Sequence, residues 1–156
     1  MVDEELERAH KVYETLSTTL DSLKLYYQKN DEMLSIDCGA QGEDLQMEIT
    51  IEVDAERQLI MLLSHMPFVI SEDKRLDVAI ATSVANNGLV DGSFDFDITD
   101  GHMFFRMTSS FIESEIGSEL FMYMLMVSCR TIDEYNDKFL MLNKGIMSVE
   151  DFIANE

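Results

Sequence analysis

The chain has 156 residues, of which 46% are hydrophobic, a length and composition typical of one folded domain, 1–156, and not of a disordered protein. Its 31 acidic and 11 basic residues give a net charge of −20, which predicts no binding to nucleic acid or to anionic membrane surfaces. No apolar stretch reaches the roughly 20 residues that a membrane-spanning helix needs, and the acidic surface either binds a basic partner or is simply solvated.

The first predicted element is a long helix over residues 2–29. Apolar side chains recur there at alternating spacings of three and four residues, on one side of a helix: Leu6, Ala9, Tyr13, Leu16, Leu20, Leu23 and Tyr27. The seam of a coiled coil has the same spacing, but here it lasts only three heptads and lacks flanking charge patterning. We therefore expect a helix that packs on a sheet.

Three strands are predicted over residues 33–66. The segment from Met33 to Cys38 is a short strand, and G-A-Q-G-E-D supplies a turn before apolar and polar residues alternate from Leu45 to Asp54. That alternation predicts one buried and one wet face. Leu59 to Leu63 is apolar on both faces, so this strand needs cover on both sides. Helices can supply one cover, and a second subunit or a ligand would supply the other.

A second helix is predicted over residues 71–88. Ser71 is its expected N-cap, and the acidic residues that follow are favourable in a first helical turn. Gly88 is expected to end the helix in the left-handed conformation. Between these ends, apolar residues recur at helical spacing: Leu76, Ala79, Ile80 and Val84.

The segment from Val90 to Met107 is either a metal loop or part of a hairpin, 93–109. It reads V-D-G-S-F-D-F-D-I-T-D-G-H-M-F-F-R-M. A calcium loop of the EF-hand type that started at Asp95 would need glycine at its sixth position and glutamate at its twelfth, where this chain has Asp100 and Arg106. The hairpin is favoured, with Asp100 and Gly101 as a two-residue type I′ turn.

That turn fixes the expected pairing of the two strands. Three apolar pairs then share one face: Ile98 with Met103, Phe96 with Phe105, and Phe94 with Met107. On the other face Asp95 lies opposite Arg106, a surface contact worth about 0.2–1 kcal/mol.

The last long helix is predicted over residues 118–144. Its first half contains eight consecutive apolar residues, L-F-M-Y-M-L-M-V from Leu120 to Val127, whereas a helix in a small domain normally has a polar side. Burial explains part of this run, and the remainder indicates an oligomer interface or a groove for an apolar peptide. Lys144-Gly145 ends the helix, and Ser148 begins a short C-terminal helix, 148–155, through S-V-E-D.

Few residues indicate catalysis, and we expect no cofactor, no metal and no enzymatic activity. His10, His65 and His102 lack partners at metal-ligand spacing, and no nucleophile elbow, phosphate loop or C-x-x-C occurs. Cys38 and Cys129 are expected to be reduced core residues of a cytoplasmic protein. The alternative is a small hydrolase or metal-assisted enzyme that uses the clustered acids Asp91, Asp95 and Asp97.

Methionine is unusually frequent, with 12 residues, and thioether side chains repack easily against varied apolar partners. Core filling is the other explanation for them. We expect a homodimer whose methionine-rich surface binds an apolar or basic protein segment, by helix-in-groove or by strand addition. The candidate partner or dimer surface consists of Leu59, Met61, Leu63, Phe121, Met122, Met124 and Met126.

The predicted order is helix, three strands, helix, two strands, helix, in the α+β class. In this order, and in the segments N-N-G-L-V-D-G-S-F-D-F-D, D-G and F-F-R-M, the chain resembles the bacterial YbjN family, which has the type III secretion chaperone-like fold. The likeness covers residues 71–145, and the residues that carry it are Asn87, Gly88, Leu89, Gly92, Phe94, Asp97, Gly101 and Arg106.

The resemblance implies a single twisted antiparallel sheet of about five strands with helices packed against it, often in a homodimer. It also implies a non-enzymatic role. Secretion chaperones hold partly unfolded effector segments against apolar patches, and YbjN-like proteins carry a provisional label as sensory-transduction regulators. The family offers no catalytic or ligand-binding residues to assign to this chain.

Overall fold

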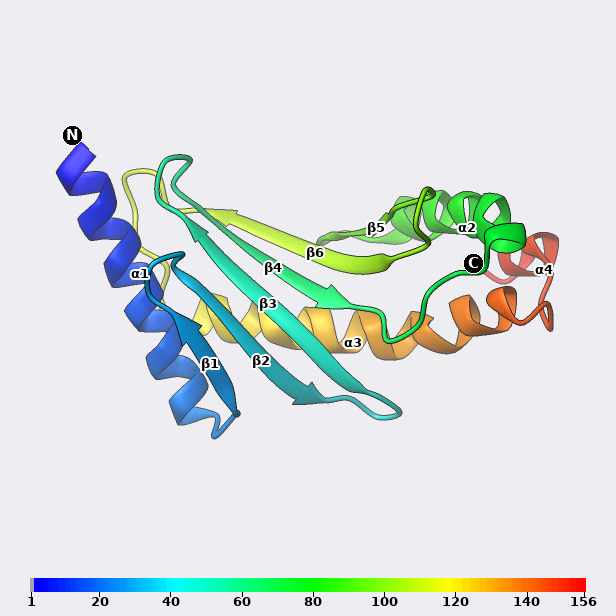
Figure 1. Cartoon of the computed structure of the whole chain (residues 1–156), viewed down its shortest axis with the longest axis horizontal. Coiled ribbons are helices and arrows are strands. Elements are labelled where there is room, and N and C mark those ends of the chain that lie inside the picture. The colour runs from blue at the N-terminus through cyan, green and yellow to red at the C-terminus, as the bar shows by residue number, and fades with distance from the viewer. Residues whose placement is uncertain (1) are drawn as a thin grey trace.

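The computed structural model describes residues 2–156, which form one antiparallel sheet of six strands together with four α-helices (Figure 1). The strands lie in the order β1-β2-β3-β4-β6-β5. The predicted α+β architecture is confirmed, with one strand more than expected. The elements are α1 (Val2–Ser22), β1 (Tyr27–Asn30), β2 (Ser35–Gln41), β3 (Gln46–Asp54), β4 (Leu59–His65), the 3₁₀ turn η1 (Glu72–Lys74), α2 (Arg75–Gly88), β5 (Ser93–Phe96), β6 (Met103–Ser110), α3 (Ser118–Asn143) and α4 (Val149–Ala154).

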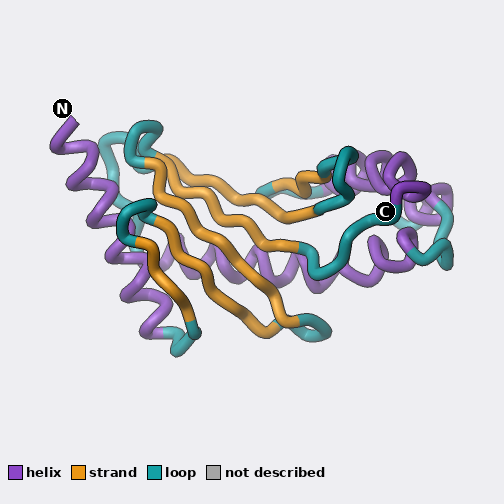
Figure 2. Tube along the Cα trace, viewed as in Figure 1, coloured by secondary structure: helices purple, strands orange, loops and turns teal. Residues whose placement is uncertain are grey.

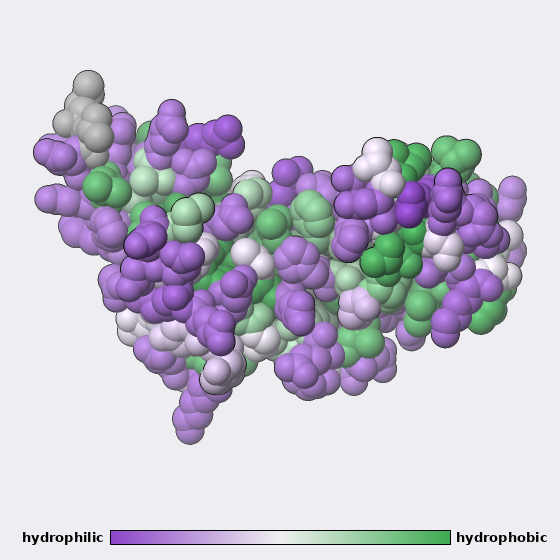
Figure 3. Space-filling model, viewed as in Figure 1, coloured by the Kyte–Doolittle hydropathy of each residue, from purple (hydrophilic) through white to green (hydrophobic). Residues whose placement is uncertain are grey.

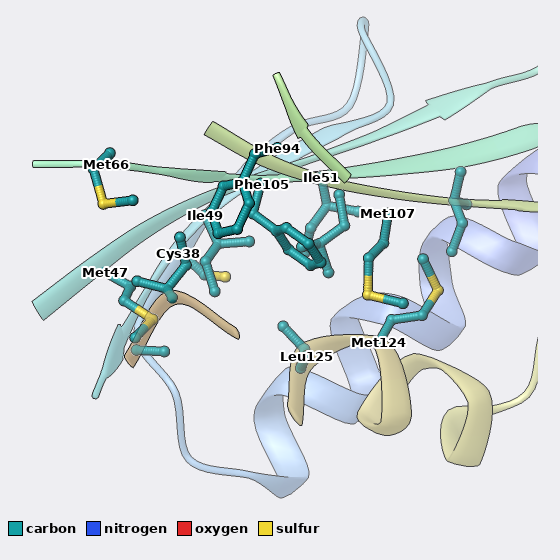
Figure 4. Close-up of a cluster of buried hydrophobic side chains, with 14 of the residues drawn as sticks. Cys38, Met47, Ile49, Ile51, Met66, Phe94, Phe105, Met107, Met124 and Leu125 are labelled. Atoms are coloured by element: carbon teal, nitrogen blue, oxygen red, sulfur yellow. The ribbon is translucent and has the colours of Figure 1, made fainter. Parts of the chain in front are cut away.

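Helices α1 and α3 pack on the same face of the sheet (Figure 1 and Figure 2). The alternation in β3 accounts for this, because Met47, Ile49, Ile51 and Val53 are buried on that face while the residues between them point away. Figure 4 shows side chains of β3 and β6 gathered with Met124 and Leu125 of α3 in this core. In residues 2–156 no helix lies over the middle strands on the other side, which we call the open face (Figure 1).

The N-terminal helix is shorter than predicted, since α1 ends at Ser22 and not at residue 29. Lys24 has a left-handed backbone, with φ of 56°. The N–H groups of Lys24 and Leu25 donate to the carbonyls of Asp21 and Leu20 at 3.0 and 3.1 Å, which is the hydrogen-bond pattern of a Schellman cap. The chain then turns back, and Tyr27 begins β1, the strand that the sequence did not predict.

At the far end of the sheet, α2 is joined to the short edge strand β5 by one side chain. The Asn86 amide donates to the carbonyl of Phe94 at 2.9 Å and accepts from the N–H of Phe94 at 2.7 Å. Asn86 therefore satisfies backbone groups that an edge strand would otherwise expose. The Phe94 ring packs edge-on against Phe105, Tyr135 and Phe139, which ties β5 to β6 and α3.

The hairpin of β5 and β6 forms, but its predicted register is wrong by two residues. Phe94 lies opposite Phe105 and Phe96 opposite Met103, so the apolar residues keep their face while the loop is longer. A type I′ turn needs positive φ at both central residues, and only Gly101 has it, at 82°. The loop is held instead by α2, because the Arg75 guanidinium donates to the carbonyls of Thr99 and Asp100 at 2.8 and 3.2 Å.

Despite the register shift, the predicted ion pair between Asp95 and Arg106 still forms. Asp95 lies directly opposite Phe104, not Arg106, yet the Arg106 guanidinium still reaches the Asp95 carboxylate diagonally, at 3.1 Å. Both side chains are partly exposed, so this ion pair contributes little to the free energy of folding.

Of the predicted helix caps, that of α4 is confirmed, the one at Ser71 is confirmed in position only, and the left-handed cap at Gly88 is wrong. Ser71 is the N-cap residue of η1, which leads into α2, but its side chain makes no capping bond, and its N–H donates to the Asn143 side chain at 2.8 Å. Gly88 is the last helical residue, and the left-handed glycine is Gly92, with φ of 71°. A Cβ at Gly92 would lie 2.8 Å from the carbonyl oxygen of Arg106, so the residue has to be glycine. Ser148 forms the predicted capping box with Asp151.

Replacing Asn86 tests the join between α2 and β5. Asn86→Ala removes both hydrogen bonds to the partly buried Phe94 backbone, so the free energy of unfolding should fall by about 1–3 kcal/mol. Asn87→Ala is the matched control, because Asn87 is an exposed neighbour on the same helix, and it should change stability by less than about 0.5 kcal/mol. Urea denaturation measures both, and equal effects of the two variants would contradict the assignment.

The hydrogen bonds of the hairpin loop predict a lowered pKa for Asp97. Hydrogen bonds from the hydroxyl and the N–H of Thr99, at 2.6 and 2.9 Å, lower the pKa of Asp97 below its ordinary 3.8. The ionised Asp97 carboxylate therefore stabilises the folded state fully above pH 3.8, and this contribution is lost as the pH falls through the lowered pKa. A carboxyl NMR titration should show the low pKa, Thr99→Val should raise it, and Thr108→Val on β6 should leave it unchanged. A pKa of 3.8 or higher in the unchanged protein would refute the prediction.

Candidate functional site

The open face of the sheet carries a row of apolar side chains. Leu59, Met61 and Leu63 alternate with the buried residues of β4 and point away from the helices, and all three are half-buried. Phe104 of β6 lies on the same face, with its ring centroid 6.1 Å from that of His65. We call these four residues, Leu59, Met61, Leu63 and Phe104, the β4 strip. Figure 3 views this side and shows hydrophobic surface over the middle of the sheet, bordered by hydrophilic residues.

Carboxylates lie along one side of the β4 strip. In the register of β3 and β4, Glu48 is opposite His65, Glu52 opposite Met61 and Asp54 opposite Leu59. Neighbouring strands are about 4.8 Å apart, so Glu52 and Asp54 flank the strip directly, and Glu48 flanks His65 at its end. Asp37 of β2 lies one strand further out, where its carboxylate accepts a hydrogen bond from Thr50 at 3.0 Å. The opposite side of the strip has Arg106, which Asp95 already neutralises.

The methionine-rich run at the start of α3 divides between the core and the surface. Phe121 and Met124, two of the candidate surface residues, are 0% and 2% exposed and belong to the core. Met122 and Met126 are 36% and 52% exposed. Phe121 and Met124 are therefore not part of a surface, whereas a binding role for Met122 and Met126 stays a prediction. The exposed apolar side chains of α3 also include Leu120 and Tyr123. Beside it, between α3 and residues 88–91, lies a shallow groove of 390 Å³.

A third apolar surface was not predicted. The buried side of α2 consists of Val78, Ala81, Thr82 and Ala85. Of the predicted stripe, Val84 packs partly against the core, whereas Leu76 and Ile80 face outward. Leu76 and Ile80 are 72% and 48% exposed. The sequence did contain a signal, because Ala81 and Ala85 repeat at helical spacing opposite Leu76 and Ile80. We call the exposed apolar residues around α2 and α4 the α2 patch: Val69, Leu76, Ile80, Ile98, Ile146 and Ile153.

The acids of the alternative, enzymatic prediction are not gathered into one site. Asp91 accepts a hydrogen bond from the Tyr123 hydroxyl, which raises the pKa of Tyr123. Asp95 pairs with Arg106, and Asp97 caps its own loop. Within residues 2–156 no group of three or more His, Cys, Asp or Glu side chains is placed to hold a metal ion.

The two cysteines are free thiols, and neither is activated. Cys38 is buried on β2, and burial raises its pKa to about 12. Burial also raises the pKa of Cys129 on α3. A reactive cysteine has the opposite shift, because the thiolate is the nucleophile.

Within residues 2–156 no helix is both long enough and apolar enough to cross a bilayer. Neither a protein-family model nor a curated protein sequence matches the chain.

Two solved structures do match. YbjN from E. coli, provisionally described as a transcription regulator, superposes with a TM-score of 0.58 over 81% of this chain and 92% of its own, at 14% sequence identity. A chain of the ExsC–ExsE complex superposes with a TM-score of 0.59 over 83% of this chain and 93% of its own, at 17% identity. At these identities the likeness concerns the fold. The chain has a YbjN-like, secretion-chaperone-like fold, as its sequence predicted.

Proposed function

We propose that this chain is a non-enzymatic protein-binding module, chaperone-like or regulatory, that acts as a homodimer in the cytoplasm. The observation that carries the proposal is the amount of apolar side chain left at the surface of so acidic a protein, on the α2 patch, on α3 and on the β4 strip. Exposed apolar patches on soluble proteins mark interaction sites when they are contiguous. The free, unactivated thiols fit a reducing compartment.

The α2 patch suits a second copy of the chain. Two copies that each carry a charge of −20 repel one another, so they can associate only through a face with little charge. The outward side of α2 is the candidate, because the exposed side chains of Leu76, Ile80, Ser83 and Asn87 are uncharged, although the half-buried acid Asp77 lies beside them. A two-fold axis across this helix would bring the same residues together from both copies and bury Leu76 and Ile80.

The remaining apolar surfaces then serve a partner protein. The β4 strip and the exposed residues of α3 lie on elements other than α2, so a dimer through the α2 patch leaves them free. One of the matching folds was solved as a complex of two proteins, which supports a protein as the partner. Met61, Met122 and Met126 give both surfaces side chains that adapt to varied apolar groups.

The dimer can be tested by one substitution in the α2 patch. Light scattering should give the unchanged protein twice the 17.9 kDa mass of the chain. Ile80→Glu should give a monomer, because two like charges would meet at the axis, while circular dichroism shows an intact fold since Ile80 is exposed. Met126→Glu on α3 introduces the same charge elsewhere and should remain dimeric. A monomeric unchanged protein would contradict the proposed homodimer.

A further inference from the structure

The open face offers side chains and no free backbone groups, because β3 and β4 are hydrogen-bonded on both sides. An added strand needs an edge, and the edges of this sheet are β1 and β5. A sheet face is covered instead by helices, as α1 and α3 cover the opposite face here. The geometry of this face therefore favours a helix as its occupant.

The charges on this face disfavour a second copy and favour a basic ligand. Glu48, Glu52 and Asp54 lie on the β3 side of the β4 strip, and a second copy would add three more acids to the same apolar surface. Asp54 has a weak counterion in Arg57, whose Nε lies 3.8 Å away. Glu48 and Glu52 are exposed on β3, so a cationic side chain can pair with them from solution. Such pairs mainly determine which partner binds and how fast it associates.

We propose that the open face binds a basic amphipathic helix of a partner protein. This inference rests on the proposed protein-binding function and names the surface and the chemistry of the partner. The apolar stripe of that helix covers the β4 strip, and its Lys or Arg residues lie on the flank over β3. The complex thus has the sheet between helices on both sides, which satisfies the apolar residues on both faces of β4.

The distance between the carboxylates on β3 determines how far apart the basic residues of the partner helix have to lie. Glu48 and Glu52 are four residues apart on β3, which corresponds to about 13 Å of strand. A helix rises about 1.5 Å per residue, so this length corresponds to about nine residues. The nearest positions on the same side of a helix are seven or eight apart and span about 10.5–12 Å, so long basic side chains there can reach both carboxylates. Leu59 and Leu63 span the same length of β4, so two to three turns of helix cover the strip.

The probe is a synthetic amphipathic peptide of about 18 residues, or five turns, with a leucine stripe and lysines on one flank. Its counterpart has glutamate in place of each lysine. Fluorescence anisotropy at about 0.15 M salt should show binding of the lysine peptide and at least about tenfold weaker binding of the glutamate peptide. Failure of the lysine peptide to bind would overturn the inference.

Paired variants locate the site. Met61→Ser with Leu63→Ser removes the middle of the strip, and Glu48→Gln with Glu52→Gln removes the carboxylates; each pair should weaken binding about tenfold. The matched controls on α3 are Met122→Ser with Met126→Ser, and Glu119→Gln with Glu134→Gln, all of exposed residues. The controls should leave the affinity within about twofold, since a twofold change is below the effect of a lost contact.

Methionine methyl NMR supplies a readout that does not depend on substitutions. With the methionine methyl groups labelled, the lysine peptide should shift Met61 and leave Met122 and Met126 unshifted. Shifts at Met122 and Met126 with none at Met61 would move the site to α3 and overturn the inference while the protein-binding function stands. Absence of peptide binding, together with a monomer in light scattering, would count against both the basic-helix site and the proposed protein-binding function.

Discussion

The packing of α1 and α3 against one face of the sheet is the interaction on which the rest of the structure depends. It buries Ile36, Ile49, Ile51 and Phe105 completely or nearly so, and it uses the two longest helices of the described chain. Because both helices lie on one side, the apolar residues on the other side of β4 stay half-buried. The shorter helices α2 and α4 pack at the β5 end of the sheet and do not cover this side of β4.

Charge is the basis on which we assign different partners to the α2 patch and the β4 strip. A net charge of −20 makes copies of the chain repel one another, so the proposed dimer uses the outward side of α2, where the exposed residues are uncharged. The β4 strip differs, because the carboxylates of β3 stand beside its leucines and methionine. In the proposed function both surfaces bind through apolar residues: the carboxylates beside the β4 strip suit it to a basic ligand, and the outward side of α2 is assigned to self-association.

Sequence patterns predicted the parts of the fold that follow from local periodicity. The alternation from Leu45 to Asp54 specified β3 and its buried face, and S-V-E-D specified the cap of α4. The end of α1 was missed because Tyr27 continues the helical spacing and no glycine marks the left-handed residue, which is Lys24. The hairpin register was missed because Arg75, from a different element, holds the loop open. In the eight-residue apolar run of α3 no polar residue reveals the phase, so Met124 could not be separated from Met126.

The assignment of the α2 patch to a second copy and of the open face to a partner can be tested on the purified protein alone. Hydroxyl-radical footprinting, compared above and below the concentration at which the dimer dissociates, reports which side chains the dimer covers. The account predicts that Leu76 and Ile80 become protected in the dimer while Met61 and Phe104 remain equally reactive in both states. Protection of Met61 and Phe104 with no change at Ile80 would contradict it, because the dimer would then be covering the open face.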